Sequence, residues 1–151
     1  LLHQITELEL HDAVTVTGYL TDDEFDGLIQ LSNVVLNLRY PSMGESSGTM
    51  YKAMAREKPC IVSNYGQFAE LPDDACWKIS TDHLEVHELV SALAELLHDP
   101  TLARTLGTNA KSYVQRFSSY ELSARLYANV LAETVAAITA GGNSGEKRSA
   151  A

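Results

Sequence analysis

Apolar, strand-like segments alternate with helix-like segments along this chain, and that alternation limits the fold more than any other feature. The strand-like segments are AVTVTGYL (13–20), VVLNLRY (34–40), PCIVSN (59–64) and CWKIS (76–80). They are short and rich in β-branched or other apolar residues, as strands are. Strands that alternate with helices form parallel sheets covered by helices on both faces. The sequence therefore predicts an α/β fold with a parallel sheet and flanking helices.

The helical segments show apolar residues at helical spacing together with start and stop signals. Thr21 and Glu24 form a capping box, and we interpret SSYE (118–121) as a second one. The pair Asp99-Pro100 separates two helices. Helices are predicted over residues 1–9, from 21, over about 47–56, over 86–97, from 101 and from 118 onward.

The size and charge of the chain narrow its class. Its 151 residues suffice for one domain, which we assign to 1–138; the Gly- and Ser-rich end, 139–151, is predicted to be disordered. The formal net charge of −9 argues against nucleic-acid binding, which needs clustered Lys and Arg. No apolar run reaches the roughly 18 residues of a membrane helix, and the first residues lack the basic start of a signal peptide. We therefore expect a cytoplasmic protein.

The two cysteines, Cys60 and Cys76, each lie in an apolar, strand-like segment. This setting favours two buried free thiols over a disulfide. Neither the cysteines nor the five histidines show the spacing of metal ligands, so we expect no metal site.

A loop of small polar residues, PSMGESSG (41–48), follows the second predicted strand and leads into a helix. Such loops lie at the carboxyl edge of a parallel sheet, where these sheets bind ligands. The backbone N–H groups at the helix start are unpaired and little hindered, so a phosphate or diphosphate fits there. The residues concerned are Ser46, Ser47, Gly48 and Thr49.

Glu45 is the one acid in this loop. A carboxylate repels a phosphate, but it can accept hydrogen bonds from the hydroxyls of a neutral group attached to that phosphate, such as a sugar. The pattern therefore suggests a sugar phosphate or a nucleotide sugar. A plainer alternative stays open, in which Glu45 is a solvated loop acid and Ser47 only a helix N-cap. Lys52, one turn into the helix, either leans toward the phosphates or is solvated.

The segment PSMGESSGTMYKAMAREKPCIVSNYGQFAEL (41–71) resembles the donor-site signature of retaining GT-B glycosyltransferases of the group 1 (family 4) type. The matching features are Pro-Ser, the acid-containing loop, Ala-Met-Ala on the helix, Pro-Cys-Ile-Val and a turn that ends in Glu. The segments before and after it also resemble the family, over roughly residues 8–135. The resemblance implies a Rossmann-like fold, namely most of the C-terminal, donor-binding domain of a GT-B enzyme without its first strands.

The resemblance also implies roles by position. Glu45 would be the catalytic-site acid that holds hydroxyls of the donor sugar. Lys52 stands where the family usually has a second Glu, so that a cation would contact phosphate there instead of an acid contacting ribose. The remaining donor-binding positions would be the backbone of Ser46, Ser47, Gly48 and Thr49, with Tyr19 and Leu20 near the nucleotide base.

As a function, the resemblance implies transfer of a sugar from a nucleoside diphosphate sugar to an acceptor, with retention and with no metal or other cofactor. The implied partner is an N-terminal acceptor-binding domain, which this chain lacks, so the chain alone is not expected to turn over substrate. The parent enzyme is expected in the cytoplasm, either free or docked on the inner membrane face.

Two alternatives stay open. One is a non-catalytic module of the same fold that binds a glycan or a protein, and Lys52 in place of the second acid favours it. The other is a sugar-nucleotide epimerase or a phosphorylase on the same frame, which ranks last because its further catalytic groups would lie outside this sequence.

Overall fold

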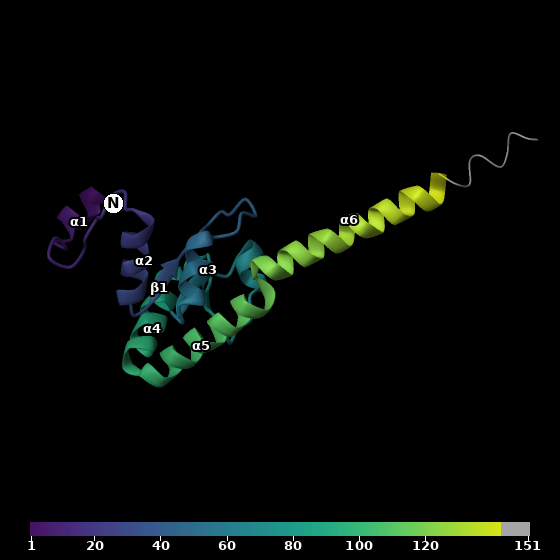
Figure 1. Ribbon diagram of the computed structural model, residues 1–151. Helices are drawn as coiled ribbons and strands as arrows, with labels where there is room; N and C mark the ends of the chain where they lie inside the picture. Colours follow the sequence, from purple (N-terminus) through teal and green to yellow (C-terminus); the bar gives the residue numbers. More distant parts are fainter. Residues whose placement is uncertain (143–151) are drawn as a thin grey trace, which may run out of the picture.

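A three-stranded parallel sheet forms the centre of the molecule, in a computed structural model that describes residues 1–142 (Figure 1). The strands are β1 (Val35–Asn37), β2 (Cys60–Ser63) and β3 (Trp77–Ile79), in the order β1-β2-β3. Both pairs are parallel, with Leu36 opposite Ile61 and Val62 opposite Lys78. The predicted α/β fold with a parallel sheet is confirmed, although the strands are shorter than the sequence segments that predict them.

Helices connect and flank these strands. They are α1 (Leu2–Glu7), α2 (Asp22–Leu31), α3 (Gly48–Ala55), α4 (Glu85–His98), α5 (Pro100–Phe117) and α6 (Tyr120–Gly142), with a 3-10 turn η1 (Gly66–Glu70) after β2. The Thr21–Glu24 capping box is present at the start of α2, as predicted. Asp99 caps α5 and Pro100 occupies its first turn, which confirms the boundary predicted between α4 and α5.

The core lies on both faces of β2, whose residues are all buried. Because side chains alternate along a strand, Cys60 and Val62 pack with α3 on one face while Ile61 packs with α4 on the other. Cys60 and Cys76 are buried and free, as expected. Burial raises the pKa of the Cys60 thiol to about 12 and that of Cys76 to about 11. Both thiols therefore serve as apolar core groups.

The strand predicted at 13–20 is wrong. The segment pairs with none of the three strands, the N–H groups of Ala13 and Val14 bond to the oxygen of Leu10 in a turn, and Val16 is 51% exposed. A strand needs a neighbour for its backbone N–H and C=O groups, and β-branched composition alone does not supply one. The segment 34–40 was expected to be buried on both faces, yet Leu36 is 46% exposed because β1 lies at the edge of the sheet.

The last helix, α6, extends away from the body of the molecule (Figure 1). Ser119 caps its start by accepting a hydrogen bond from the N–H of Leu122 at 3.1 Å, so the cap lies one residue after the predicted Ser118. The helix ends at Gly142 and so includes the first residues of 139–151, the segment for which disorder is predicted; the rest of that prediction falls on residues outside the description. Residues 143–151 lie outside the described part of the chain.

A buried serine joins the end of β1 to the start of α3. The hydroxyl of Ser47 accepts a hydrogen bond from the N–H of Met50 at 3.3 Å and donates one to Oδ1 of Asn37 at 2.8 Å. Ser47 is 1% exposed and Asn37 is 7% exposed. The N-cap predicted at Ser47 is therefore also a link between helix and sheet, and it fixes where the preceding loop ends.

Replacing Ser47 with Ala removes both hydrogen bonds and leaves the amide oxygen of Asn37 buried without a donor. We expect Ser47→Ala to lower the free energy of unfolding by about 1–3 kcal/mol, measured by urea denaturation. Ser46→Ala is the control, because Ser46 is exposed, and it should change stability by less than about 0.5 kcal/mol. Equal stabilities of the two variants would contradict the role of Ser47.

A second close contact holds α5 against the end of α3. Glu57, in the left-handed region at φ 57, directs its carbonyl oxygen at Gly107 of α5. A Cβ atom on Gly107 would meet that oxygen at 2.1 Å, which requires a backbone shift. Glycine at this position therefore permits the approach of the two helices.

We expect Gly107→Ala to lower the free energy of unfolding by about 1–3 kcal/mol, because the added methyl overpacks the α3–α5 contact. Gly27→Ala in α2 is a matched control, since a Cβ there meets nothing within 4 Å. The control should be stabilising by about 0.5–1 kcal/mol, as alanine is the better helix former. Thermal or urea unfolding measures both, and stabilisation by Gly107→Ala would exclude the close packing described here.

Candidate functional site

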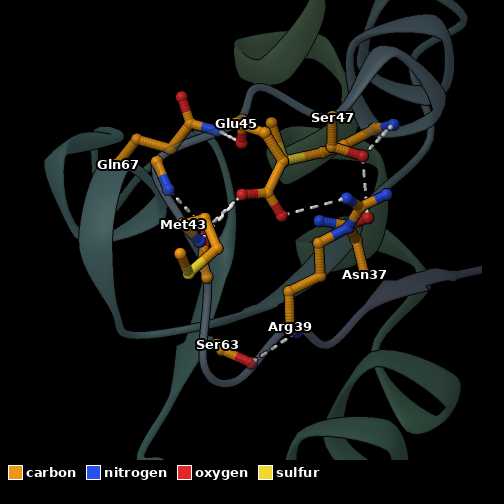
Figure 2. Close-up of polar contacts among 10 residues, drawn as sticks. Asn37, Arg39, Met43, Glu45, Ser47, Ser63 and Gln67 are labelled. Carbon is orange, nitrogen blue, oxygen red and sulfur yellow. Dashed lines mark hydrogen bonds and ion pairs between the residues drawn. The ribbon is translucent and has the colours of Figure 1, made fainter.

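The loop between β1 and α3 lies at the carboxyl edge of the sheet and gathers polar side chains from three elements (Figure 2). Asn37 ends β1 and Arg39 follows it by two residues, Ser63 ends β2, and Gln67 lies in the turn that follows β2. Gln67 donates a hydrogen bond through Nε2 to the backbone oxygen of Glu45. The loop is therefore held to the sheet on more than one side.

The carboxylate of Glu45 is oriented by its own loop. Its Oε2 accepts a hydrogen bond from the N–H of Met43 at 2.8 Å and one from the hydroxyl of Ser42 at 3.3 Å. Its Oε1 lies 3.5 Å from Nη1 of Arg39. The side chain is 47% exposed, so Oε1 retains capacity for further hydrogen bonds on the solvent side.

These contacts lower the pKa of the Glu45 carboxyl below its ordinary value, first through its own backbone N–H and next through that of Met43. The Ser42 hydroxyl and the Arg39 guanidinium act in the same direction. The carboxylate, which only accepts hydrogen bonds, is thus the form present at neutral pH. This favours binding of hydroxyl groups over general-acid chemistry at this position.

The start of α3 offers unpaired backbone donors beside Glu45. The first intrahelical bond runs from the N–H of Tyr51 to the oxygen of Ser47, and the Ser47 hydroxyl takes the N–H of Met50. The N–H groups of Gly48 and Thr49 precede these bonds. A Cβ atom on Gly48 would meet nothing within 4 Å, so no other group crowds this first residue of α3. An anionic oxygen fits there.

The structure brings together Glu45, Ser46, Ser47, Gly48 and Thr49, but it does not bring Lys52 to them. Nζ of Lys52 lies 3.4 Å from Oδ1 of Asp22 and 5.7 Å from the centre of the Phe25 ring. Lys52 therefore faces α2.

Tyr19 and Leu20 come immediately before Thr21, the cap of α2. Tyr19 is 97% exposed and Leu20 is partly buried. Because Lys52 of α3 pairs with Asp22 in the first turn of α2, the start of α2 lies beside α3. The two residues are thus on the α2 side of the loop, next to the helix that carries the open amides.

Sequence reasoning missed Asn37, Arg39 and Gln67. A signal for the first two was present, since residues two apart at the end of a strand point to the same face. The contact of Gln67 with the loop depends on the path of the chain after β2, which local pattern does not reveal.

The molecule has hollows away from this loop. One, of about 440 Å³, lies between the start of β3 and α5, and its lining includes Trp77, Lys78 and Asn109. Among the described residues, no group of three His, Cys, Asp or Glu side chains could hold a metal ion. Within the same part of the chain, every helix is too short or too polar to cross a membrane.

Comparison with known proteins points to one family. The family model described as "Glycosyl transferases group 1" matches residues 1–113. The α-D-kanosaminyltransferase of Streptomyces kanamyceticus is 28% identical over 102 residues, which are 67% of this chain and 26% of that enzyme. The structure of sucrose-phosphate synthase from Thermosynechococcus elongatus superposes with a TM-score of 0.73 at 28% identity, over 89% of this chain and 33% of that one.

This chain thus spans about a quarter to a third of the length of the relatives it matches. The match includes the β1–α3 loop with Glu45, β2 and the helices around the sheet. The parallel sheet with flanking helices is a Rossmann-like part of a GT-B fold, and the chain belongs to the group 1 glycosyl transferases.

Proposed function

We propose that this chain is the donor-binding part of a retaining glycosyltransferase that moves a sugar from a nucleoside diphosphate sugar to an acceptor. The observation that carries the proposal is the oriented carboxylate of Glu45, which lies two residues before the buried cap of an open helix start. The carboxylate suits a neutral ring that carries hydroxyls, and the helix start suits an anion. A nucleotide sugar presents both, joined by one bond.

The diphosphate would be bound at the start of α3. The backbone N–H groups of Ser46, Ser47, Gly48 and Thr49 donate hydrogen bonds there, and the helix dipole adds favourable charge. Because negative charge on the diphosphate grows as the bond to the sugar breaks, these fixed donors stabilise the departing group more than the intact donor. No metal or other cofactor is required for this step in the proposal.

The sugar would be held by Glu45. Oε2 is committed to the loop, whereas Oε1 is free on its solvent side to accept a hydrogen bond from a sugar hydroxyl. Tyr19 and Leu20, on the α2 side, would lie near the nucleotide base. Lys52 would support them by fixing the start of α2 through Asp22, because its ammonium faces away from Glu45.

The acceptor would be bound by a separate N-terminal domain facing this edge of the sheet. The share of its relatives that the chain spans leaves room for such a domain. The chain alone would then bind a donor without turning it over, because the cleft in which transfer occurs has two walls. For the parent protein we propose a cytoplasmic location, with peripheral docking at the inner membrane face where the acceptor is a lipid.

A non-catalytic module of the same fold is the second candidate. It is favoured by the ion pair of Lys52 with Asp22, because this pair turns the ammonium group of Lys52 toward α2 and away from the loop. Titration calorimetry of the full-length protein with UDP and GDP separates the two candidates. Binding supports the transferase, whereas the lack of any binding at millimolar ligand supports the module.

We expect Glu45→Gln to lower kcat/KM for sugar transfer by roughly ten- to a hundredfold, since a hydrogen bond to a charged group contributes about 1.5–3 kcal/mol. The assay uses the full-length protein with candidate nucleotide sugars. Glu57→Gln is the matched control, because Glu57 is also half-exposed and ion-paired, with Lys111, but lies at the other end of α3. Turnover that is the same in Glu45→Gln and in the control excludes the role proposed for Glu45.

A further inference from the structure

We propose that Arg39 is the side-chain cation that binds the diphosphate of the donor at the start of α3. This inference rests on the proposed function and names a residue that neither the sequence motifs nor the family match assigns. It concerns how one guanidinium serves the two parts of the donor, the sugar and the diphosphate.

The backbone of Arg39 is bonded to β2, the central strand of the sheet. Its backbone N–H donates a hydrogen bond to the hydroxyl of Ser63 at 2.9 Å, and Ser63, the last residue of β2, is 0% exposed. The side chain beyond this anchor is 39% exposed. Arg39 therefore combines a fixed starting point with a charged end that reaches solvent at the ligand-binding edge.

Two contacts show the direction of the Arg39 side chain, which belongs to a residue two positions beyond Asn37, the last residue of β1. The side chain of Asn37 points to one face of the strand. Asn37 accepts a hydrogen bond from Ser47, the cap of α3, which shows that this face is the one on which α3 begins. Figure 2 shows the Arg39 side chain extending from the strand end toward the Glu45 carboxylate. The guanidinium thus lies beside the Glu45 carboxylate, two residues before the cap of α3.

A second observation points to an anionic ligand at this place. Nδ2 of Asn37 is buried and has no hydrogen-bond partner among the described residues. A buried donor without an acceptor is costly, and such groups mark places where a further acceptor belongs. The helix amides, the amide nitrogen of Asn37 and the guanidinium of Arg39 are all donors. A phosphoryl group, with its several acceptor oxygens and its charge, matches that set.

The contact of Arg39 with Glu45 explains how an acid and an anion site can be neighbours. Arg39 faces Oε1 of Glu45, the oxygen that the loop does not use, at the long distance of 3.5 Å. A diphosphate carries more charge than one carboxylate and accepts both arms of the guanidinium fork, so it competes for Arg39. When Arg39 turns to the diphosphate, the side of Oε1 that faced Arg39 becomes available to a sugar hydroxyl in addition to its solvent side. Binding of the two parts of the donor is thereby linked.

The test measures affinity of the full-length protein for UDP and GDP by titration calorimetry. Arg39→Gln should lower the affinity for the tighter-binding of the two ligands by roughly tenfold or more, because a charge-assisted hydrogen bond is lost. Arg39→Lys keeps the positive charge but loses the two-armed guanidinium. Its affinity for the diphosphate should lie between that of Arg39→Gln and that of the native protein. Lys111→Gln is the matched control, since Lys111 is ion-paired and 39% exposed like Arg39 but lies on α5, and it should leave the affinity unchanged.

A third variant tests the link to the sugar site, and here the affinity for the diphosphate should rise instead of fall. Glu45→Gln removes the competitor of the diphosphate, so the affinity for UDP or GDP should rise by roughly two- to fivefold, as expected for a half-exposed ion pair. Native affinity in both Arg39→Gln and Arg39→Lys would overturn the inference while leaving the proposed function intact. If the native protein binds neither diphosphate, the proposed function fails, and the role of Arg39 fails with it.

Discussion

The hydroxyl of Ser47 bonds the end of the first strand to the start of the helix that follows, and the geometry of the site depends on this connection. It satisfies one helix amide and the amide oxygen of Asn37 while almost completely buried. The N–H groups of Gly48 and Thr49 precede the first bonds of the helix, and a Cβ atom on Gly48 would meet nothing within 4 Å. A loop that ends at a fixed point can hold Glu45 in one orientation, and its internal hydrogen bonds do so. The site is thus built mainly from backbone groups and from short side chains that stabilise the backbone.

Local signals in the sequence were sufficient for the parts of the fold that local interactions stabilise. The capping box at Thr21, the cap at Ser47 and the Asp99-Pro100 boundary each involve residues within one helical turn, and each is present. The segment 13–20 failed as a strand because a strand depends on a partner distant in the sequence. Its alternating β-branched residues show a preference for strands, but in the structure the segment begins in a turn and has no partner strand.

The same distinction applies to the charged residues of the candidate site. Glu45 could be singled out because it stands in a loop between a strand and a helix. The partners of the cations could not be predicted, since Lys52 pairs with Asp22, 30 residues away, and the backbone of Arg39 bonds to Ser63, 24 residues away. The sequence motif put Lys52 among the donor-binding positions and gave Arg39 no role, whereas in the structure Arg39 lies beside Glu45 and Lys52 of α3 pairs with Asp22 of α2.

The central claim is that one edge of this sheet separates a charged ligand group from a neutral one, with backbone amides facing the first and Glu45 the second. A crystal structure of the full-length protein with a bound nucleoside diphosphate sugar tests it most directly. The account predicts phosphate oxygens within hydrogen-bond distance of the N–H groups of Gly48 and Thr49, and a sugar hydroxyl on Oε1 of Glu45. A diphosphate bound elsewhere, such as in the hollow between β3 and α5, would contradict it.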